Sequence, residues 1–153
     1  MNIRAPLGFS LLEIVVALGI LSLLAGLGAN AFFSARAKQD LNHATSEITA
    51  LLREARSRTL ASEDGMPFGV FFLADRAILF RGQAYSEGES AEKTVQMPPR
   101  IEIAAINLSG NKTVFERLLG NAVPAGDVTV RLRGDAGVSR VVVINADGLV
   151  YVE

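Results

Sequence analysis

The chain has 153 residues, enough for one ordinary domain, and half of them are hydrophobic. A formal net charge of −1 excludes a global basic field that would attract nucleic acid or an anionic membrane. The absence of cysteine excludes disulfides, thiolate metal sites and cysteine nucleophiles. The sequence also lacks the motifs of phosphate-binding loops, serine hydrolases, zinc proteases and dinucleotide sites, so it predicts neither an enzyme nor a bound cofactor.

A membrane-length apolar segment lies near the N-terminus. Residues 14–33 are interrupted only by Ser22, Asn30 and glycines. About 20 apolar residues are enough to span a bilayer core as a helix. Glu13 stands at the head of this segment, where a carboxylate is costly unless something pairs with it.

Three interpretations fit this segment. It is a plain membrane anchor, a secretory signal cleaved at the Ala29-Asn30-Ala31 site, or a segment that follows a short leader ending at Gly8. The apolar run is longer than the core of a usual secretory signal, and the predicted helix continues past Ala31. Both observations disfavour the secretory signal.

The residues around Glu13 favour the short leader. Residues 1–8 carry one basic side chain and end in glycine, and Phe9-Ser10-Leu11-Leu12-Glu13 and the apolar run follow. This order resembles the N-terminal signal of type IV prepilins and type II secretion pseudopilins. The resemblance implies cleavage between Gly8 and Phe9 by a membrane prepilin peptidase, which also methylates the new N-terminal Phe9.

The same resemblance implies an assembly role for Glu13. In the family, this carboxylate of an incoming subunit meets the free amine of Phe9 on a neighbour in the filament. An α-amine has a pKa of about 7.7–8.0 and is largely protonated at neutral pH, so the pair relieves two desolvation penalties and fixes the axial register.

The resemblance also implies the partners and the location. The partners are the prepilin peptidase and methyltransferase, other pilins or pseudopilins, the inner-membrane assembly platform and membrane lipid. The chain is expected in the inner membrane as a single-pass protein, with its β domain on the periplasmic side, and in a filament after assembly.

One nearly continuous helix is predicted from about Phe9 to Leu60, because no proline occurs between Leu7 and Pro67. Residues 9–33 form the membrane or filament-core half of this helix. Residues 34–62 continue it as an amphipathic helix that packs one face on a globular domain. Its apolar stripe consists of Leu41, Ala44, Ile48, Leu51, Leu52, Ala55 and Thr59. His43 has no second ligand nearby and is interpreted as a surface or packing residue.

Residues 63–153 read as a globular antiparallel β domain, because Glu63-Asp64-Gly65-Met66-Pro67 breaks the helix and short apolar runs alternate with turns afterwards. Residues 83–92 are predicted to be a loop, and short turns predict a meandering antiparallel sheet. The fold class is therefore α+β and pilin-like. The predicted strands are Phe68–Leu73, Ala77–Phe80, Thr94–Met97, Ile101–Ile106, Thr113–Phe115, Asp127–Arg133, Val138–Ile144 and Leu149–Val152.

The order of these elements narrows the resemblance. Paired prolines within Met97–Ile103, then Thr113-Val114-Phe115, a Gly-rich loop, and Arg140-Val141-Val142-Val143 before Asp147-Gly148 look like the GspH/FimT group. That group comprises minor pseudopilins of type II secretion and minor pilins of type IV pili.

Two alternatives remain open beside the filament subunit. Arg131, Arg133 and Arg140 lie on neighbouring predicted strands and suggest a DNA-binding pilin for uptake, but the tail after Gly148 lacks the arginines of such pilins, so nucleic acid is not the expected partner. The second alternative is a membrane-anchored β domain with an unknown ligand.

The acidic residues near turns do not predict a metal site. Asp127, Asp135 and Asp147 are scattered, and acidic turn residues usually cap the backbone rather than bind calcium.

Overall fold

The computed structural model describes two stretches of the chain, residues 9–85 and 91–153. Side chains that lie outside this description are those of residues 25, 27–34 and 136. The chain divides into two compact units, Met1–Arg36 and Ala37–Glu153.

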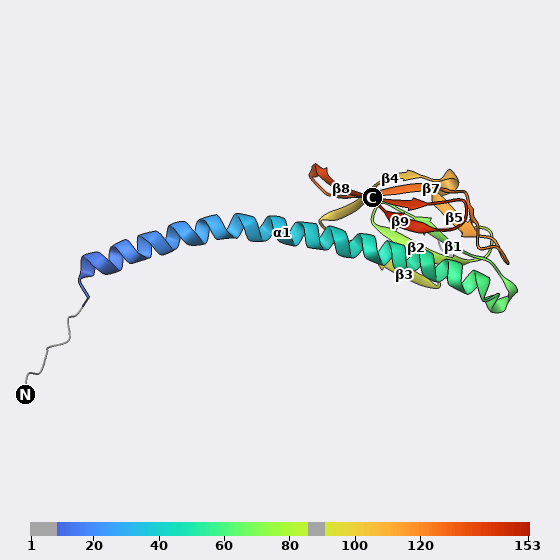
Figure 1. Ribbon diagram of the computed structural model, residues 1–153, viewed down its shortest axis with the longest axis horizontal. Helices are drawn as coiled ribbons and strands as arrows, with labels where there is room; N and C mark the ends of the chain where they lie inside the picture. Colours follow the sequence, from blue (N-terminus) through green and yellow to red (C-terminus); the bar gives the residue numbers. More distant parts are fainter. Residues whose placement is uncertain (1–8, 86–90) are drawn as a thin grey trace, which may run out of the picture. The chain divides into compact units, whose positions relative to one another are not determined.

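A single long helix runs through both units (Figure 1). Helix α1 spans Leu11–Leu60, 50 residues without a break, so the predicted continuous helix is confirmed. A short 3-10 turn, η1 at Glu63–Gly65, follows at the predicted break. Asp64 in this turn has a positive φ of 51°, a backbone conformation that cannot continue a right-handed helix.

The strands form two antiparallel sheets, which confirms the α+β fold class. The first sheet has the order β3-β2-β1-β5-β6, and the second has the order β4-β7-β8-β9. The bounds are β1 Phe68–Phe72, β2 Arg76–Arg81, β3 Lys93–Gln96, β4 Ile101–Asn107, β5 Lys112–Phe115, β6 Ala122–Val123, β7 Gly126–Leu132, β8 Asp135–Ile144 and β9 Val150–Val152, with a second 3-10 turn, η2, at Ser109–Asn111.

The single meander expected from the sequence is wrong in one respect. Pro98 and Pro99 lie between β3 and β4, and proline has no N–H with which to extend a ladder, so β4 begins a second sheet. The chain then returns to the first sheet, where β5 pairs with β1 and with the two-residue β6. Strand β6 was not predicted, because it lies within the Gly-rich segment that was interpreted as a loop. Part of another predicted loop, residues 83–92, falls outside the described residues at 86–90.

The apolar stripe of α1 is buried as predicted. All seven of its residues, from Leu41 to Thr59, are buried. This part of α1 lies along the two sheets (Figure 1). The six hydrophobic residues of the stripe belong to one buried cluster with Phe68 of the first sheet and Val130 of the second. Full burial of a side chain such as leucine stabilises the fold by about 1.5–3 kcal/mol, so this seam is a major source of stability.

Strands β1 and β2 of the first sheet are buried on both faces, whereas the edge strand β3 is largely exposed. The outer face of this sheet carries Phe71 and Phe80, and Tyr85 packs on both rings with centroid distances of 5.3 and 5.5 Å. Gly69 lies between them, and a Cβ there would come within 2.6 Å of the Phe80 ring and of the Thr113 carbonyl oxygen. Coverage on both faces explains why the strands β1 and β2 are continuously apolar rather than alternating.

Two arginines of α1 hold the C-terminal turn against the helix. Arg53 donates a hydrogen bond to the carbonyl of Val150, and Arg56 donates to the carbonyls of Gly120 and Asp147, all within 3.1–3.2 Å. Gly148 sits where these groups converge. A Cβ on Gly148 would come within 2.8 Å of Arg56 Nε and would overlap the Gly120 carbonyl oxygen. The position therefore requires glycine for space as well as for its φ of 72°.

We predict that Gly148→Ala destabilises the fold by about 2–4 kcal/mol, because the left-handed backbone and the steric overlap both penalise a side chain. Gly65→Ala is the matched control, since Gly65 has a φ of 65° but nothing within 4 Å of its Cβ position. The control should cost only about 1–2 kcal/mol. Urea unfolding of the full chain in detergent, followed by circular dichroism, measures both values. Equal losses would show that the packing against Arg56 and Gly120 is unimportant.

Candidate functional site

The predicted processing and assembly residues lie at the start of α1. Gly8 falls outside the described residues. Phe9 and Ser10 precede the helix, and the carbonyl of Ser10 accepts the first helical hydrogen bond from the N–H of Ile14 at 3.2 Å. Glu13 lies in the first turn, where a negative charge is favourable next to the unpaired N–H groups of the helix.

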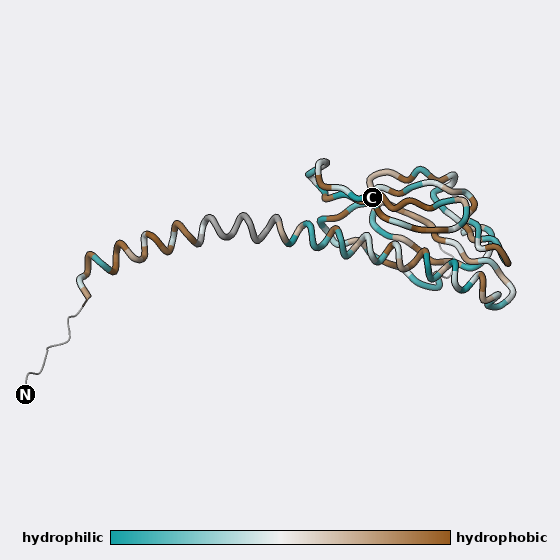
Figure 2. The backbone as a smooth tube through the Cα atoms, viewed as in Figure 1, coloured by the Kyte–Doolittle hydropathy of each residue, from teal (hydrophilic) through white to brown (hydrophobic). Residues whose placement is uncertain are grey.

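The helix around Glu13 exposes an unusual amount of apolar surface. Figure 2 shows hydrophobic residues following one another around its first turns. Eleven large hydrophobic side chains between Phe9 and Leu24 are at least half exposed, from 51% for Ile14 to 80% for Leu11. A helix that is apolar on all sides is normally covered by lipid or by other protein. Such a surface is a candidate contact for lipid or for another protein.

Within the described part of the chain, no helix is both long and apolar enough to cross a membrane. The predicted span, residues 9–33, includes side chains that lie outside the description.

The three predicted arginines do not form one patch. Arg131 lies opposite Glu102 on β4, and its Nε donates to the Glu102 carboxylate at 2.7 Å. Arg133 Nε approaches the other oxygen of that carboxylate at 3.5 Å. Arg140 pairs with the buried Val130, so it lies on the opposite face of the sheet from Arg131. The pleat separates Arg140 from the other two, and Glu102, which sequence analysis overlooked, neutralises part of their charge.

The acidic turn residues make backbone and side-chain hydrogen bonds. Asp135 accepts a hydrogen bond from the N–H of Gly137 at 3.0 Å, as expected of a turn aspartate. Asp127 accepts one from the Asn107 amide at 2.9 Å. Among the described residues, no group of three acidic, histidine or cysteine side chains is placed to hold a metal ion. His43 is exposed on α1.

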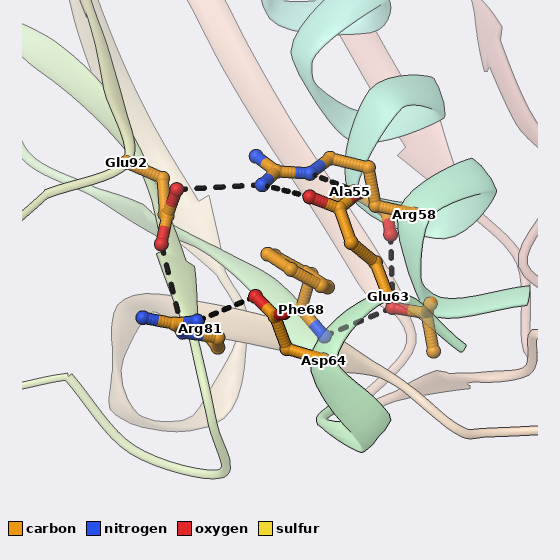
Figure 3. A network of polar contacts seen from close by, with 8 residues as sticks. Ala55, Arg58, Glu63, Asp64, Phe68, Arg81 and Glu92 are labelled. Carbon is orange, nitrogen blue, oxygen red and sulfur yellow. Dashed lines mark hydrogen bonds and ion pairs between the residues drawn. The ribbon is translucent and has the colours of Figure 1, made fainter. Parts of the chain in front are cut away.

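A polar network that the sequence did not reveal closes the C-terminal end of α1 (Figure 3). Arg58 binds both carboxylate oxygens of Glu63, at 2.7 and 2.9 Å, and reaches Glu92 at 3.3 Å. Arg81 binds Asp64 at 2.6 Å and lies 3.6 Å from Glu92. The network joins the helix, η1, β2 and the residue that precedes β3.

The strand that follows this network is tied to the helix directly. The Arg58 guanidinium lies 4.3 Å from the centroid of the Phe68 ring, a favourable cation–π contact. The N–H of Phe68 donates to Thr59 Oγ1 at 2.9 Å, and that hydroxyl donates to the carbonyl of Ala55 at 2.9 Å. The buried hydroxyl of Thr59 therefore has both a donor and an acceptor partner, and it fixes where β1 begins.

The network shifts the ionisation of its members. The hydrogen bond from Arg58, followed by its charge, lowers the pKa of Glu63 below the ordinary 4.5. The same hydrogen bond is the main reason that the pKa of Arg58 lies above its usual value. Because the pKa of Glu63 is lower in the folded chain, its contribution to stability is present above pH 4.5 and is lost as the pH falls through the folded pKa.

We predict that Glu63→Gln lowers stability at pH 7 and has no effect at a pH low enough to protonate Glu63 in the folded chain. The glutamine keeps the size of the side chain but cannot form the charged pair with Arg58. Denaturant midpoints of the two proteins, measured between pH 7 and pH 2.5 by circular dichroism, should converge as the pH falls below about 4.5. A difference that is independent of pH would contradict an ionic role for Glu63.

The fold of this chain is shared by solved structures of a minor pilin and a minor pseudopilin. The type IV minor pilin FimU of Pseudomonas aeruginosa PAO1 superposes with a TM-score of 0.56 at 18% identity, covering 79% of this chain and 92% of that chain. A second crystal form of FimU gives a TM-score of 0.54. The minor pseudopilin EpsH of the Vibrio cholerae type 2 secretion system gives 0.55 at 9% identity, covering 74% of this chain and 96% of that chain.

Comparisons of the amino-acid sequence found no relative of this chain. No protein-family model matches the chain, and no curated protein sequence matches it. At these identities the likeness shows the fold, and the pilin-like fold expected from the N-terminal motif is confirmed.

Proposed function

We propose that this chain is a minor pilin or pseudopilin subunit. It is cleaved after Gly8, methylated on Phe9 and assembled into the filament of a type II secretion system or a type IV pilus. Its role is structural rather than catalytic. The fold shared with a minor pilin and a minor pseudopilin supports this proposal, together with the leader motif around Gly8 and Phe9.

The observation that carries the proposal is the exposed apolar helix with one carboxylate in its first turn. The large hydrophobic side chains from Phe9 to Leu24 are at least half exposed. Lipid covers this surface before assembly and neighbouring helices cover it afterwards. Glu13 is the one acidic group among these residues, and it needs a cationic partner in either environment.

The partner of Glu13 is the N-terminal amine that cleavage creates on a neighbouring subunit. A carboxylate costs about 2.5–3.5 kcal/mol at the centre of a membrane helix and less near its end, where Glu13 lies, and pairing with an ammonium group offsets this cost. A subunit out of register would leave both charges unpaired. The pair therefore selects the position of each incoming subunit, while apolar contacts supply the affinity.

The remaining partners follow from the same route. The chain is inserted in the inner membrane, meets the prepilin peptidase and methyltransferase there, and passes to the assembly platform. The unit formed by Ala37–Glu153 has its own hydrophobic core. In this proposal the unit is displayed on the periplasmic side.

We predict that Glu13→Gln blocks assembly but leaves processing intact. Removing one partner of a buried ion pair costs about 3–5 kcal/mol, so incorporation should fall at least about tenfold. Comparing the chain in the sheared filament fraction with the chain in membranes measures incorporation, and mass spectrometry of the membrane pool checks cleavage. Glu47→Gln, the same change outside the apolar segment of α1, is the control. Equal incorporation of both variants would contradict the role given to Glu13.

A further inference from the structure

A small groove between α1 and β8 carries two cations. This basal groove has a volume of about 350 Å³ and is lined by Lys38, Leu41 and Asn42 of the helix and by residues 137–140 of β8. Lys38 and Arg140 are exposed, and neither makes a hydrogen bond or an ion pair with another described residue. Two like charges that line one groove repel each other, so an anion bound there would be stabilised by both.

The basal groove also offers an apolar floor and a backbone donor. Leu41 is 2% exposed, and Val138 is half-buried. The backbones of Val141 and Glu153 exchange hydrogen bonds at 2.9 and 3.1 Å, so the N–H of Ser139, two residues along β8, also faces away from β7. The chain ends at Glu153, so no strand lies beside Ser139 on that side. The groove thus combines two cations, an N–H group and an apolar surface.

The acidic groups nearby leave the basal groove positively charged. None of its lining residues is acidic. The Asp135 carboxylate lies close by and accepts a backbone hydrogen bond at 3.0 Å. Asp40 lies about 200° around the helix from Lys38 and so faces away from the groove. Glu153 lies opposite the neighbour of Arg140 on β8, so its side chain is on the other face of the sheet. Two cations therefore face one carboxylate.

The place of the basal groove along α1 indicates the source of an anion. The apolar segment ends at Phe33, and Lys38 follows it by five residues, which is about 7.5 Å of helix. A bilayer has a hydrocarbon core of about 30 Å and is about 40–45 Å thick with its headgroups, so each headgroup layer is about 5–7.5 Å deep. Helical side chains lean toward the N-terminus, and a lysine reaches further back. With the apolar segment in the bilayer, Lys38 lies at the level of the phosphates.

We propose that the basal groove binds the headgroup of an anionic membrane phospholipid. Arg140 and Lys38 contact the phosphate, the N–H of Ser139 donates to the headgroup, and Leu41 and Val138 contact the glycerol carbons. A volume of about 350 Å³ suits a headgroup, so the acyl chains stay in the bilayer. The net charge of the chain is −1, so the attraction is local to this groove.

This inference rests on the proposed function, because it requires the apolar segment to span the membrane. It concerns the subunit before assembly, when the groove lies at the bilayer surface. It names a lipid contact of the globular unit that is separate from the contact made by Glu13.

Native mass spectrometry of the full-length chain in an uncharged detergent tests this contact. The probes are phosphatidylglycerol and phosphatidylcholine with the same acyl chains, and phosphatidylglycerol should bind at least about tenfold more tightly. Arg140→Gln and Lys38→Gln should each reduce this preference about fivefold, the contribution of one basic side chain at an anionic bilayer surface.

Arg117→Gln is the matched control. Arg117 is also exposed and has no hydrogen bond or ion pair among the described residues. It lies in the connection between β5 and β6, where the Cβ position of Gly120 is 3.1 Å from Leu60 at the far end of α1. The control should keep the full preference for phosphatidylglycerol. An equal loss in Arg117→Gln and Arg140→Gln would show a general effect of charge and overturn the proposal.

Two further results would overturn the lipid contact. One is equal binding of the two lipids, and the other is displacement of phosphatidylglycerol by an equal concentration of glycerol 3-phosphate, which would show that the groove takes a soluble anion. Incorporation of the chain into filaments, measured in cells, separates this contact from the proposed function. If the chain enters filaments without a lipid preference that depends on Arg140, the lipid contact is wrong and the filament role stands. If that preference is present but the chain never enters filaments, the lipid contact stands and the filament role is contradicted.

Discussion

The seam between α1 and the two sheets is the contact on which the globular unit depends. One stripe of the helix, from Leu41 to Thr59, is buried against strands of both sheets. Neither sheet is paired to the other by a continuous ladder, so the helix is the element that both share. Hydrogen bonds from Arg53 and Arg56 to backbone carbonyls then fix the C-terminal turn onto the same helix.

The distribution of hydrophobic side chains differs between the two parts of α1. The part that packs on the sheets is amphipathic, with charged residues off the stripe, whereas the part near Glu13 exposes apolar side chains on all sides. The apolar stripe of the amphipathic part is buried against the sheets of the same chain. The apolar surface near Glu13 would need lipid or another protein to bury it. This difference is the physical basis for the proposed role as a subunit of an assembly.

The helix and most strands could be predicted because their signals are local. The proline-free stretch and the spacing of Leu41, Ile48 and Leu52 predict both the helix and its buried face. Strand pairing depends on residues that are far apart in the sequence. The pairing of β5 with β1 therefore could not be predicted from short stretches of sequence. Strand β6 has only two residues and is defined by its pairing with β5, so no local sequence pattern could predict it.

The candidate site shows the same limit. A contiguous motif predicts roles for Gly8, Phe9 and Glu13, and these stay predictions. The placement of the basic residues required the strand register, which sets Arg140 on the other face from Arg131. The Arg58 network was invisible because Glu92 lies 34 residues away in the sequence. Charged residues that meet through the fold cannot be paired from their spacing alone.

The measurement that tests the central claim most directly is the intact mass and N-terminal sequence of the chain from membranes of cells that carry a prepilin peptidase. The account predicts a chain that begins with a methylated Phe9, which would place a free cationic amine where Glu13 of a neighbour needs it. A chain that begins at Phe32, after the Ala29-Asn30-Ala31 site, or one that still begins at Met1, would contradict the account and leave Glu13 without an assembly partner.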